Sequence, residues 1–260
     1  MNRLLRIRAS FVDWPTRRHS LAGELVCVVA LYAIYEAARG VVVGNPAAAV
    51  DHARAIASLE RSLDVFAEAH IQAAARFVPG LLGVLGVLYL TLHLAVTATY
   101  LVWLHRRRPT AYPVVRNALL IASGLALIGF LAFPTAPPRL AALGITDTIS
   151  NGHVDLNHGL VSSLYNPYAA VPSMHLGYSA IVGASLYLHG GRPILRVAAF
   201  LYPALQLFVI VATGNHFFFD AASGALVAGL AALAAVRLTT HGVAPSRLRP
   251  ARARLAPVAT

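Results

Sequence analysis

The chain has 260 residues, of which 58% are hydrophobic and only 12% are charged, and its mean hydropathy is +0.66. This composition excludes a soluble globular domain and is typical of a protein that crosses a membrane several times. The net charge of +11 comes from 21 arginines in a chain without lysine; they cluster beside apolar segments, which favours anionic membrane lipids over nucleic acid as partners. The only cysteine, Cys27, excludes an internal disulfide and a cysteine-based metal site.

Residues 1–20 carry five arginines and precede the first apolar segment. We interpret them as a basic cytoplasmic segment before an uncleaved signal anchor; the alternative is a cleaved signal peptide, because residues 47–49 imitate a cleavage site. The first span is predicted over residues 21–38. Glu24 and Glu36 lie near its two ends, where a carboxylate reaches the interface, and we interpret both as tolerated end charges.

Residues 50–76 show a helical period instead of a continuous apolar run. Their apolar side chains recur every three or four positions, at Val50, Ala53, Ile56, Leu59, Leu63 and Phe66, and charged residues, Glu60 and Glu68 among them, take the other positions. This pattern predicts one amphipathic helix that lies on the membrane surface.

Length and hydropathy predict five further spans, at residues 81–104, 114–133, 172–188, 194–213 and 217–236. The fold class is therefore predicted as all-α: a polytopic membrane protein with a bundle of six transmembrane helices and an interfacial amphipathic helix. Residues 21–238 form one membrane domain, with a long loop at 134–171. Pro203 kinks the fifth span, and the basic tail at 239–260 is predicted to be disordered on the membrane surface.

The arginines orient this bundle. With the N-terminus inside, 16 of the 21 arginines fall on the inner side and five on the outer side, as the positive-inside rule requires. We therefore expect a multi-pass protein of the plasma membrane with both termini in the cytoplasm. The interfacial helix, the loop at 134–171 and the starts of the fourth and sixth spans then face the extracytoplasmic side.

Two polar clusters lie at the starts of the predicted fourth and sixth spans, on the outer side. In residues 214–220 (GNHFFFD), His216 and Asp220 are four positions apart, so the carboxylate can hold one imidazole nitrogen and leave the other as a nucleophile or base. The alternative is a His and an Asp that only cap the helix.

In residues 172–175 (PSMH), Pro172 suits a helix start, and the free N–H groups that follow form an anion cradle. Ser173 adds a hydroxyl donor to this cradle, and His175 is placed beside it as a proton donor. Arg139, at the end of a proline-rich stretch (FPTAPPR), is a candidate clamp for a phosphate, or else an interfacial arginine that contacts lipid headgroups.

Several other polar residues carry weaker signals. Tyr89 and His93 share a face of the second span, where a hydrogen bond inside the bundle is favoured over catalysis. Tyr165, Asn166 and Tyr168 either line a headgroup pocket or belong to the aromatic belt, and Tyr168 is retained with Asn215 as a candidate for substrate binding. The residues His153, Asp155 and His158 are interpreted as solvated rather than as a metal site.

The two clusters together resemble the second and third signature motifs of the type 2 phosphatidic acid phosphatase superfamily, and the six-span layout matches that family over about residues 20–238. The resemblance implies that His216 attacks phosphorus, that Asp220 orients it and that His175 protonates the leaving group. The first motif of the phosphatases requires a lysine, which this chain lacks, and their third-motif arginine is Ile210 here. This pattern and the stretch that ends at Arg139 are more similar to the inositol phosphorylceramide synthase-like branch.

We therefore expect an enzyme without cofactor or metal that transfers or hydrolyses a lipid-linked phosphate at the outer leaflet through a phosphohistidine, with water, a polyol such as inositol or a sugar as acceptor. Only Asp147, Asp155 and Asp220 are expected near the site, too few carboxylates for a pair of metal ions. The alternative is a transporter or lipid-binding protein with a relay formed by His93, His175 and His216. A transporter would place its polar groups near the bilayer midplane, whereas here they gather at helix starts.

Overall fold

The structure is a computed structural model that describes residues 20–41, 45–148 and 166–241. Within these residues the chain is helical, and its one β-bridge joins Thr135 to Ala169. The elements in chain order are α2 (Leu21–Val41), α3 (Pro46–Ser62), α4 (Glu68–Arg76), α5 (Leu81–Arg107), α6 (Tyr112–Ala132), the 3-10 helix η1 (Pro138–Leu140), α8 (Met174–His189), α9 (Pro193–Ala212) and α10 (Phe218–His241).

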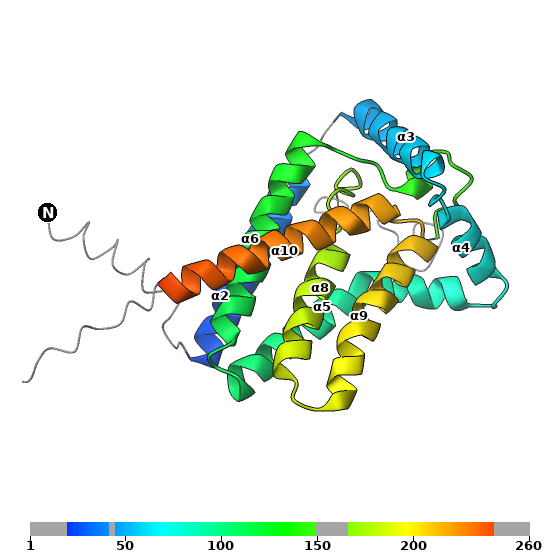
Figure 1. Ribbon diagram of the computed structural model, residues 1–260. Helices are drawn as coiled ribbons and strands as arrows, with labels where there is room; N and C mark the ends of the chain where they lie inside the picture. The colour runs from blue at the N-terminus through cyan, green and yellow to red at the C-terminus, as the bar shows by residue number, and fades with distance from the viewer. Residues whose placement is uncertain (1–19, 42–44, 149–165, 242–260) are drawn as a thin grey trace, which may run out of the picture.

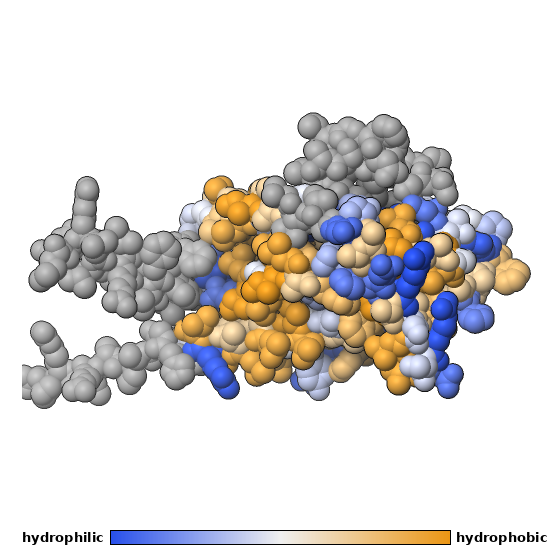
Figure 2. Space-filling model, turned by 90° about the horizontal axis from the view of Figure 1, so that it is seen from above, coloured by the Kyte–Doolittle hydropathy of each residue, from blue (hydrophilic) through white to orange (hydrophobic). Residues whose placement is uncertain are grey.

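Five of the described helices are long and apolar enough to cross a membrane, namely α2, α5, α6, α9 and α10. The predicted fourth span, α8, has only 16 residues, so the expected count of six is not confirmed. Large apolar side chains are exposed on these helices, for example Val26, Ile194 and Leu188, and apolar side chains cover much of the face in Figure 2. The protein is a helical membrane protein, and these side chains are suited to contact lipid tails.

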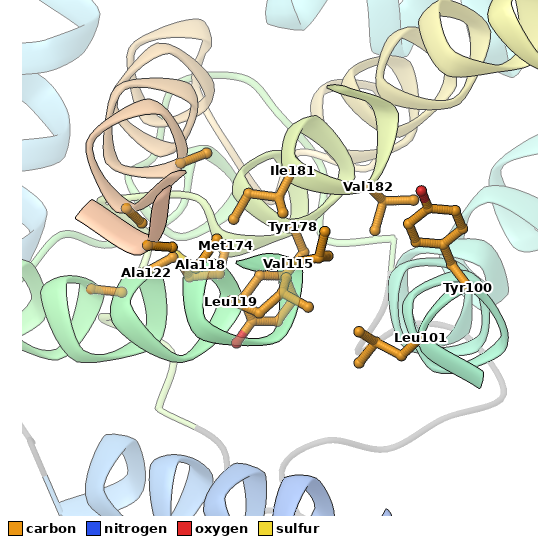
Figure 3. Close-up of a cluster of buried hydrophobic side chains, with 14 of the residues drawn as sticks. Tyr100, Leu101, Val115, Ala118, Leu119, Ala122, Met174, Tyr178, Ile181 and Val182 are labelled. Atoms are coloured by element: carbon orange, nitrogen blue, oxygen red, sulfur yellow. The ribbon is translucent and has the colours of Figure 1, made fainter. Parts of the chain in front are cut away.

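The helix α8 lies inside the bundle. It packs beside α9, while α10 crosses both α6 and α8 (Figure 1). Figure 3 shows side chains of α8 pointing toward α5 and α6 in one apolar core, labelled by Met174, Tyr178, Ile181 and Val182 from α8, Val115, Ala118, Leu119 and Ala122 from α6, and Tyr100 and Leu101 from α5. This central position places the start of α8, with the PSMH residues, against the start of α10.

The amphipathic segment is two helices, so the prediction of a single helix over residues 50–76 is wrong. The chain turns between α3 and α4, where Asp64 has a positive φ of 56°. Leu59 and Leu63 are exposed, as apolar side chains that face lipid can be. Glu60 and Glu68, which the pattern assigns to the polar face, are instead buried in the protein and only 2% and 0% exposed.

The sequence predicted a tolerated end charge at Glu24, and the structure shows that this prediction is wrong. Its carboxylate forms an ion pair with Arg116 on α6, with an N–O distance of 2.8 Å, and both side chains are almost fully buried. Tyr112 donates a further hydrogen bond to Glu24 over 3.0 Å. The pair joins the first turn of α2 to the first turns of α6. Because a buried charge without its partner is strongly destabilising, the two residues depend on each other.

Candidate active site

A tight turn between α9 and α10 carries the GNH residues. Gly214 has a φ of +69°, which a residue with a side chain rarely adopts, and its N–H donates to the Val211 carbonyl over 2.9 Å. The N–H of Asn215 donates to the Ile210 carbonyl over 3.1 Å, which completes the hydrogen-bond pattern of a Schellman motif. The glycine therefore ends α9 and turns the chain so that His216 lies next to the first turn of α10.

His216 and Asp220 form the predicted pair. The Nδ1 atom of His216 lies 3.2 Å from Oδ2 of Asp220, and both residues are buried. The same carboxylate oxygen accepts the N–H of Phe217 over 2.9 Å. Because a carboxylate accepts, Nδ1 carries the hydrogen and Nε2 keeps its lone pair. This tautomer is the one that a nucleophilic histidine needs.

Two glutamates from the amphipathic helices complete the start of α10. Glu68 accepts the N–H of Phe218 over 3.1 Å, and Glu60 accepts the N–H of Phe219 over 2.7 Å. Together with Asp220, three acidic side chains thus accept three successive N–H groups at the start of the helix. The expectation that Asp220 would be joined near the site only by aspartates of the outer loop was wrong, since α3 and α4 each contribute a buried acid. Among the described residues, no group of three or more His, Cys, Asp or Glu side chains is arranged to hold a metal ion.

This arrangement predicts a pH-dependent stability. Burial, together with a hydrogen bond between Glu60 and Glu68, raises the pKa of Glu60 from 4.5 to about 8. The folded state therefore holds this proton more tightly than the unfolded chain. The resulting stabilisation is complete below pH 4.5 and is lost as the pH rises through about 8.

We expect the melting temperature in detergent to fall between pH 5 and pH 9. The fall should be much smaller in Glu60→Gln, which keeps the oxygen that accepts the Phe219 N–H. Asp51→Asn, at an exposed position of the same helix, is the control and should follow the wild type. Parallel curves for the wild type and Glu60→Gln would contradict this assignment.

His175 is held in the first turn of α8 by α5. Its ring stacks on Tyr89, with centroids 4.3 Å apart, and its Nε2 atom lies 3.1 Å from the Tyr89 carbonyl oxygen. A carbonyl only accepts, so Nε2 carries a hydrogen and Nδ1 is the nitrogen left to exchange a proton with a substrate. The ring centroid of His175 is 5.5 Å from that of His216. The structure thus brings together the two histidines that lie 41 positions apart in the chain.

Both histidines line one small cavity of about 40 Å³, which has room for water or a small anionic group but not for a whole lipid. His93, whose ring centroid is 4.1 Å from that of His175, belongs to the same wall. The described residues around the cavity are Tyr32, Tyr35, Glu36, Arg39, Tyr89, His93, Phe130, Ala169, Met174, His175, Tyr178 and His216. From the sequence, a hydrogen bond inside the bundle was favoured over catalysis for Tyr89 and His93. The structure places both residues in the wall of the cavity.

The electrostatic surroundings favour a neutral His216. Burial of the imidazole, with the positive charges of Arg39 and Arg139 nearby, lowers the pKa of His216 to about 3. An uncharged ring at neutral pH has the lone pair that attack on phosphorus requires.

Ser173 is not among the described residues that line the cavity. It precedes α8 and is fully buried, and its N–H donates to the Asp220 carbonyl over 3.0 Å. This N–H is therefore used inside the protein, which removes one donor of the predicted anion cradle. The bond also fixes the start of α8 directly to α10.

Arg139 is tied to the same turn by two contacts and to Asp147 by a third. Its N–H donates to the Gly214 carbonyl over 3.0 Å, its Nε donates to the Asn215 side chain over 2.9 Å, and its Nη1 lies 2.6 Å from the Asp147 carboxylate. Asn215 in turn donates to the Thr213 hydroxyl over 2.8 Å. Arg139 and Asn215 are thus parts of one hydrogen-bonded support behind His216, and neither belongs to the described wall of the cavity.

Tyr168 also lies outside that described wall, and it packs against the apolar cluster that contains Val171 and Phe217. Its carbonyl accepts the N–H of Thr135 over 2.7 Å, so it joins the proline-rich stretch to the PSMH segment. Residues 153, 155, 158 and 165, which the sequence analysis considered, lie outside the described residues.

The comparison with known families now bears on this geometry. The profile of the PAP2 superfamily matches residues 54–234, which is more than half of the chain. The chain belongs to the PAP2 superfamily. No curated protein and no solved structure matches it.

Membership of the PAP2 superfamily confirms the resemblance at the level of the superfamily and makes the protein a phosphatase-type enzyme for lipid phosphates. The matched residues contain His175, His216 and Asp220 together with the capping residues Glu60 and Glu68. They do not contain α2, which nevertheless contributes Glu36 and Arg39 to the cavity.

Proposed function

We propose that this PAP2 protein transfers the phosphoryl group of a lipid-linked phosphate through a phosphohistidine on His216. Nε2 of His216 attacks phosphorus, and the bond from phosphorus to the ester oxygen breaks. His175, which takes up a proton at Nδ1 when the phosphate binds, gives that proton to the oxygen that leaves. An acceptor hydroxyl, from water or an alcohol, then gives its proton to His175, attacks the phosphohistidine and frees His216. Asp220 holds the imidazole and stabilises the positive charge that develops on it.

The observation that carries this proposal is that His175 and His216 line one small cavity and that Asp220 holds the ring of His216. Asp220 fixes the tautomer of His216 over 3.2 Å, and His175 faces His216 with ring centroids 5.5 Å apart. A phosphoryl group between the rings would have a nucleophile on one side and a proton donor on the other, which is the geometry of an in-line displacement.

An adjoining apolar cavity supports a lipid as the substrate. It has a volume of about 310 Å³, and it is lined from α2, α5 and α6 by residues such as Val28, Leu101 and Leu127. Tyr32, Tyr35 and Tyr178 line both this cavity and the catalytic one. A hydrocarbon chain in the apolar cavity would bring its phosphate to the histidines.

The acceptor is proposed to be a polyol such as inositol or a sugar, with water as the competing acceptor. The absence of lysine from the sequence rules out the first motif of the phosphatases and supports the inositol phosphorylceramide synthase-like branch. The arginine bias supports a site at the extracytoplasmic leaflet of the plasma membrane, with anionic lipids around the cytoplasmic arginines.

The test is incubation of purified protein with a lipid extract, with and without inositol and sugars, followed by mass spectrometry of the phosphorylated products. A new phospho-product that requires an added polyol identifies a transferase, and release of inorganic phosphate alone identifies a phosphatase. A soluble short-chain lipid phosphate that cannot cross the membrane should be turned over by intact cells, because the site faces outward.

We expect turnover to survive strong chelation, because a guanidinium rather than a metal meets the charge of the phosphate. Orthovanadate should inhibit, since it imitates the five-coordinate phosphorus of the transfer. An enzyme that a chelator inactivates and Mg²⁺ or Zn²⁺ restores would contradict the metal-independent mechanism. Turnover only after permeabilisation would show that the site faces the cytoplasm and would contradict the proposed orientation.

A further inference from the structure

The end of α2 brings two charged side chains to the catalytic cavity. Glu36 and Arg39 both line it beside His93, His175 and His216. They form an ion pair over 3.2 Å, and both side chains are largely buried. From the sequence, Glu36 was expected to be an end charge and Arg39 one of the outer arginines, so neither was a candidate for the site.

Arg39 is held in place by the segment that leads to α8. The side chain of Asn166 donates to the Arg39 carbonyl over 3.0 Å, and the same side chain accepts the N–H of Tyr168 over 2.9 Å. Asn166 thus connects the end of α2 to the residues that lead to His175. The helix α2 lies outside the part of the chain that matches the PAP2 superfamily, and Asn166 thereby connects it to the segment that carries the PSMH residues.

His216 attacks as a neutral imidazole, so the charge of a bound phosphate needs a permanently positive group beside it. Among the described residues that line the cavity, Arg39 is the one guanidinium. Arg139, the arginine predicted for this purpose, supports the turn behind His216 through Asn215 and Asp147. The effect of each charge on His216 agrees with this placement, because Arg39 lowers the pKa of that imidazole more than Arg139 does.

We propose that Arg39 is a phosphate-binding residue of this site and that Glu36 orients it. The inference rests on the proposed function and deepens it by assigning the group that binds the anionic part of the lipid phosphate. A guanidinium has five N–H donors in a planar fork, so it can bond a carboxylate and two phosphate oxygens at the same time. Glu36 keeps the guanidinium at the cavity when no phosphate is bound, and it limits affinity by competing for the same donors.

The test measures phosphate recognition separately from stability. The variants are Arg39→Gln, Arg39→Lys and Glu36→Gln, and Arg54→Gln is the matched control because Arg54 forms an exposed pair with Asp51 on α3. The readouts are KM for a lipid phosphate, kcat, the inhibition constant of orthovanadate and the melting temperature in detergent.

For Arg39→Gln we expect KM and the vanadate inhibition constant to rise together by about tenfold or more, because a charge-assisted bidentate contact to the phosphate is lost. Arg39→Lys should recover part of this loss, and Arg54→Gln should match the wild type. Glu36→Gln should bind vanadate more tightly, because the competing carboxylate is gone. If Arg39→Gln is too unstable to purify, Arg39→Lys and Glu36→Gln still decide the question.

An Arg39→Gln enzyme with unchanged KM and vanadate inhibition would overturn the proposal, even if its melting temperature falls. Unchanged vanadate inhibition in Arg39→Lys and Glu36→Gln would overturn it as well. Failure here is distinct from failure of the proposed function. In the first case the wild type still turns over lipid phosphates and depends on His216, and in the second it does not.

Discussion

Replacement of His216 by alanine should reduce turnover of a lipid phosphate by at least about a thousandfold, because the variant lacks the nitrogen that attacks phosphorus. The loss should occur without loss of folding. The His216 ring lies at the wall of a cavity, and the N–H groups that begin α10 keep their carboxylate partners on Glu60, Glu68 and Asp220. The measurement is the initial rate with purified protein, together with the melting temperature in detergent.

Two companion variants make this result specific. His70→Ala removes an exposed histidine from α4 and should leave the rate unchanged. Asp220→Asn should be severe but milder than His216→Ala, because it keeps the shape of the side chain and loses the charge that supports the imidazolium. If His216→Ala retains more than a few per cent of the wild-type rate, the phosphohistidine mechanism must be abandoned.

The second large effect is expected at Gly224, where α10 presses against the start of α8. A Cβ atom added at Gly224 would lie 2.1 Å from the carbonyl oxygen of Ser173 and 3.0 Å from its carbonyl carbon. These are backbone atoms, and the N–H of Ser173 is also bound to the Asp220 carbonyl, so they cannot move aside as a flexible side chain would. Gly224→Ala should therefore destabilise the protein by about 2–3 kcal/mol or more and separate His175 from His216.

Gly229 on the same helix provides the matched control. A Cβ atom there meets no heavy atom within 4 Å, so Gly229→Ala should be tolerated, and alanine should favour the helix by up to about 1 kcal/mol. The melting temperature and the rate of both variants are compared in the same detergent. A Gly224→Ala protein that melts and turns over substrate like the wild type would show that the contact between α8 and α10 is not needed for the site.

Some features of the site follow from local patterns that the sequence displays directly. His216 and Asp220 are four positions apart at a helix start, and that spacing alone places the carboxylate beside the ring. Gly214 before them marks the end of a helix for a local reason, since only glycine adopts its backbone conformation without strain. The apolar lengths of the chain likewise predicted the helical membrane fold, because the bilayer requires long apolar helices.

Local patterns predicted the amphipathic helices less well. Hydropathy assigns Glu60 to the polar face of its helix, yet the side chain is buried in the protein. The reason is a tertiary hydrogen bond, because the first N–H groups of α10 need acceptors and α3 and α4 supply them.

The sequence by itself therefore determined the helical membrane class and the pairing of His216 with Asp220, because each depends on composition or on residues within one turn of a helix. The resemblance of its two motifs to a known family indicated the superfamily. Only the tertiary structure decided that His175, His93 and Arg39 share one cavity, and that Arg139 supports the turn instead of lining the described wall. Those residues come from separate helices, and no periodicity within one helix records which faces will meet. Their distances result from the packing of α2, α5, α8 and α10, which is a property of the whole bundle.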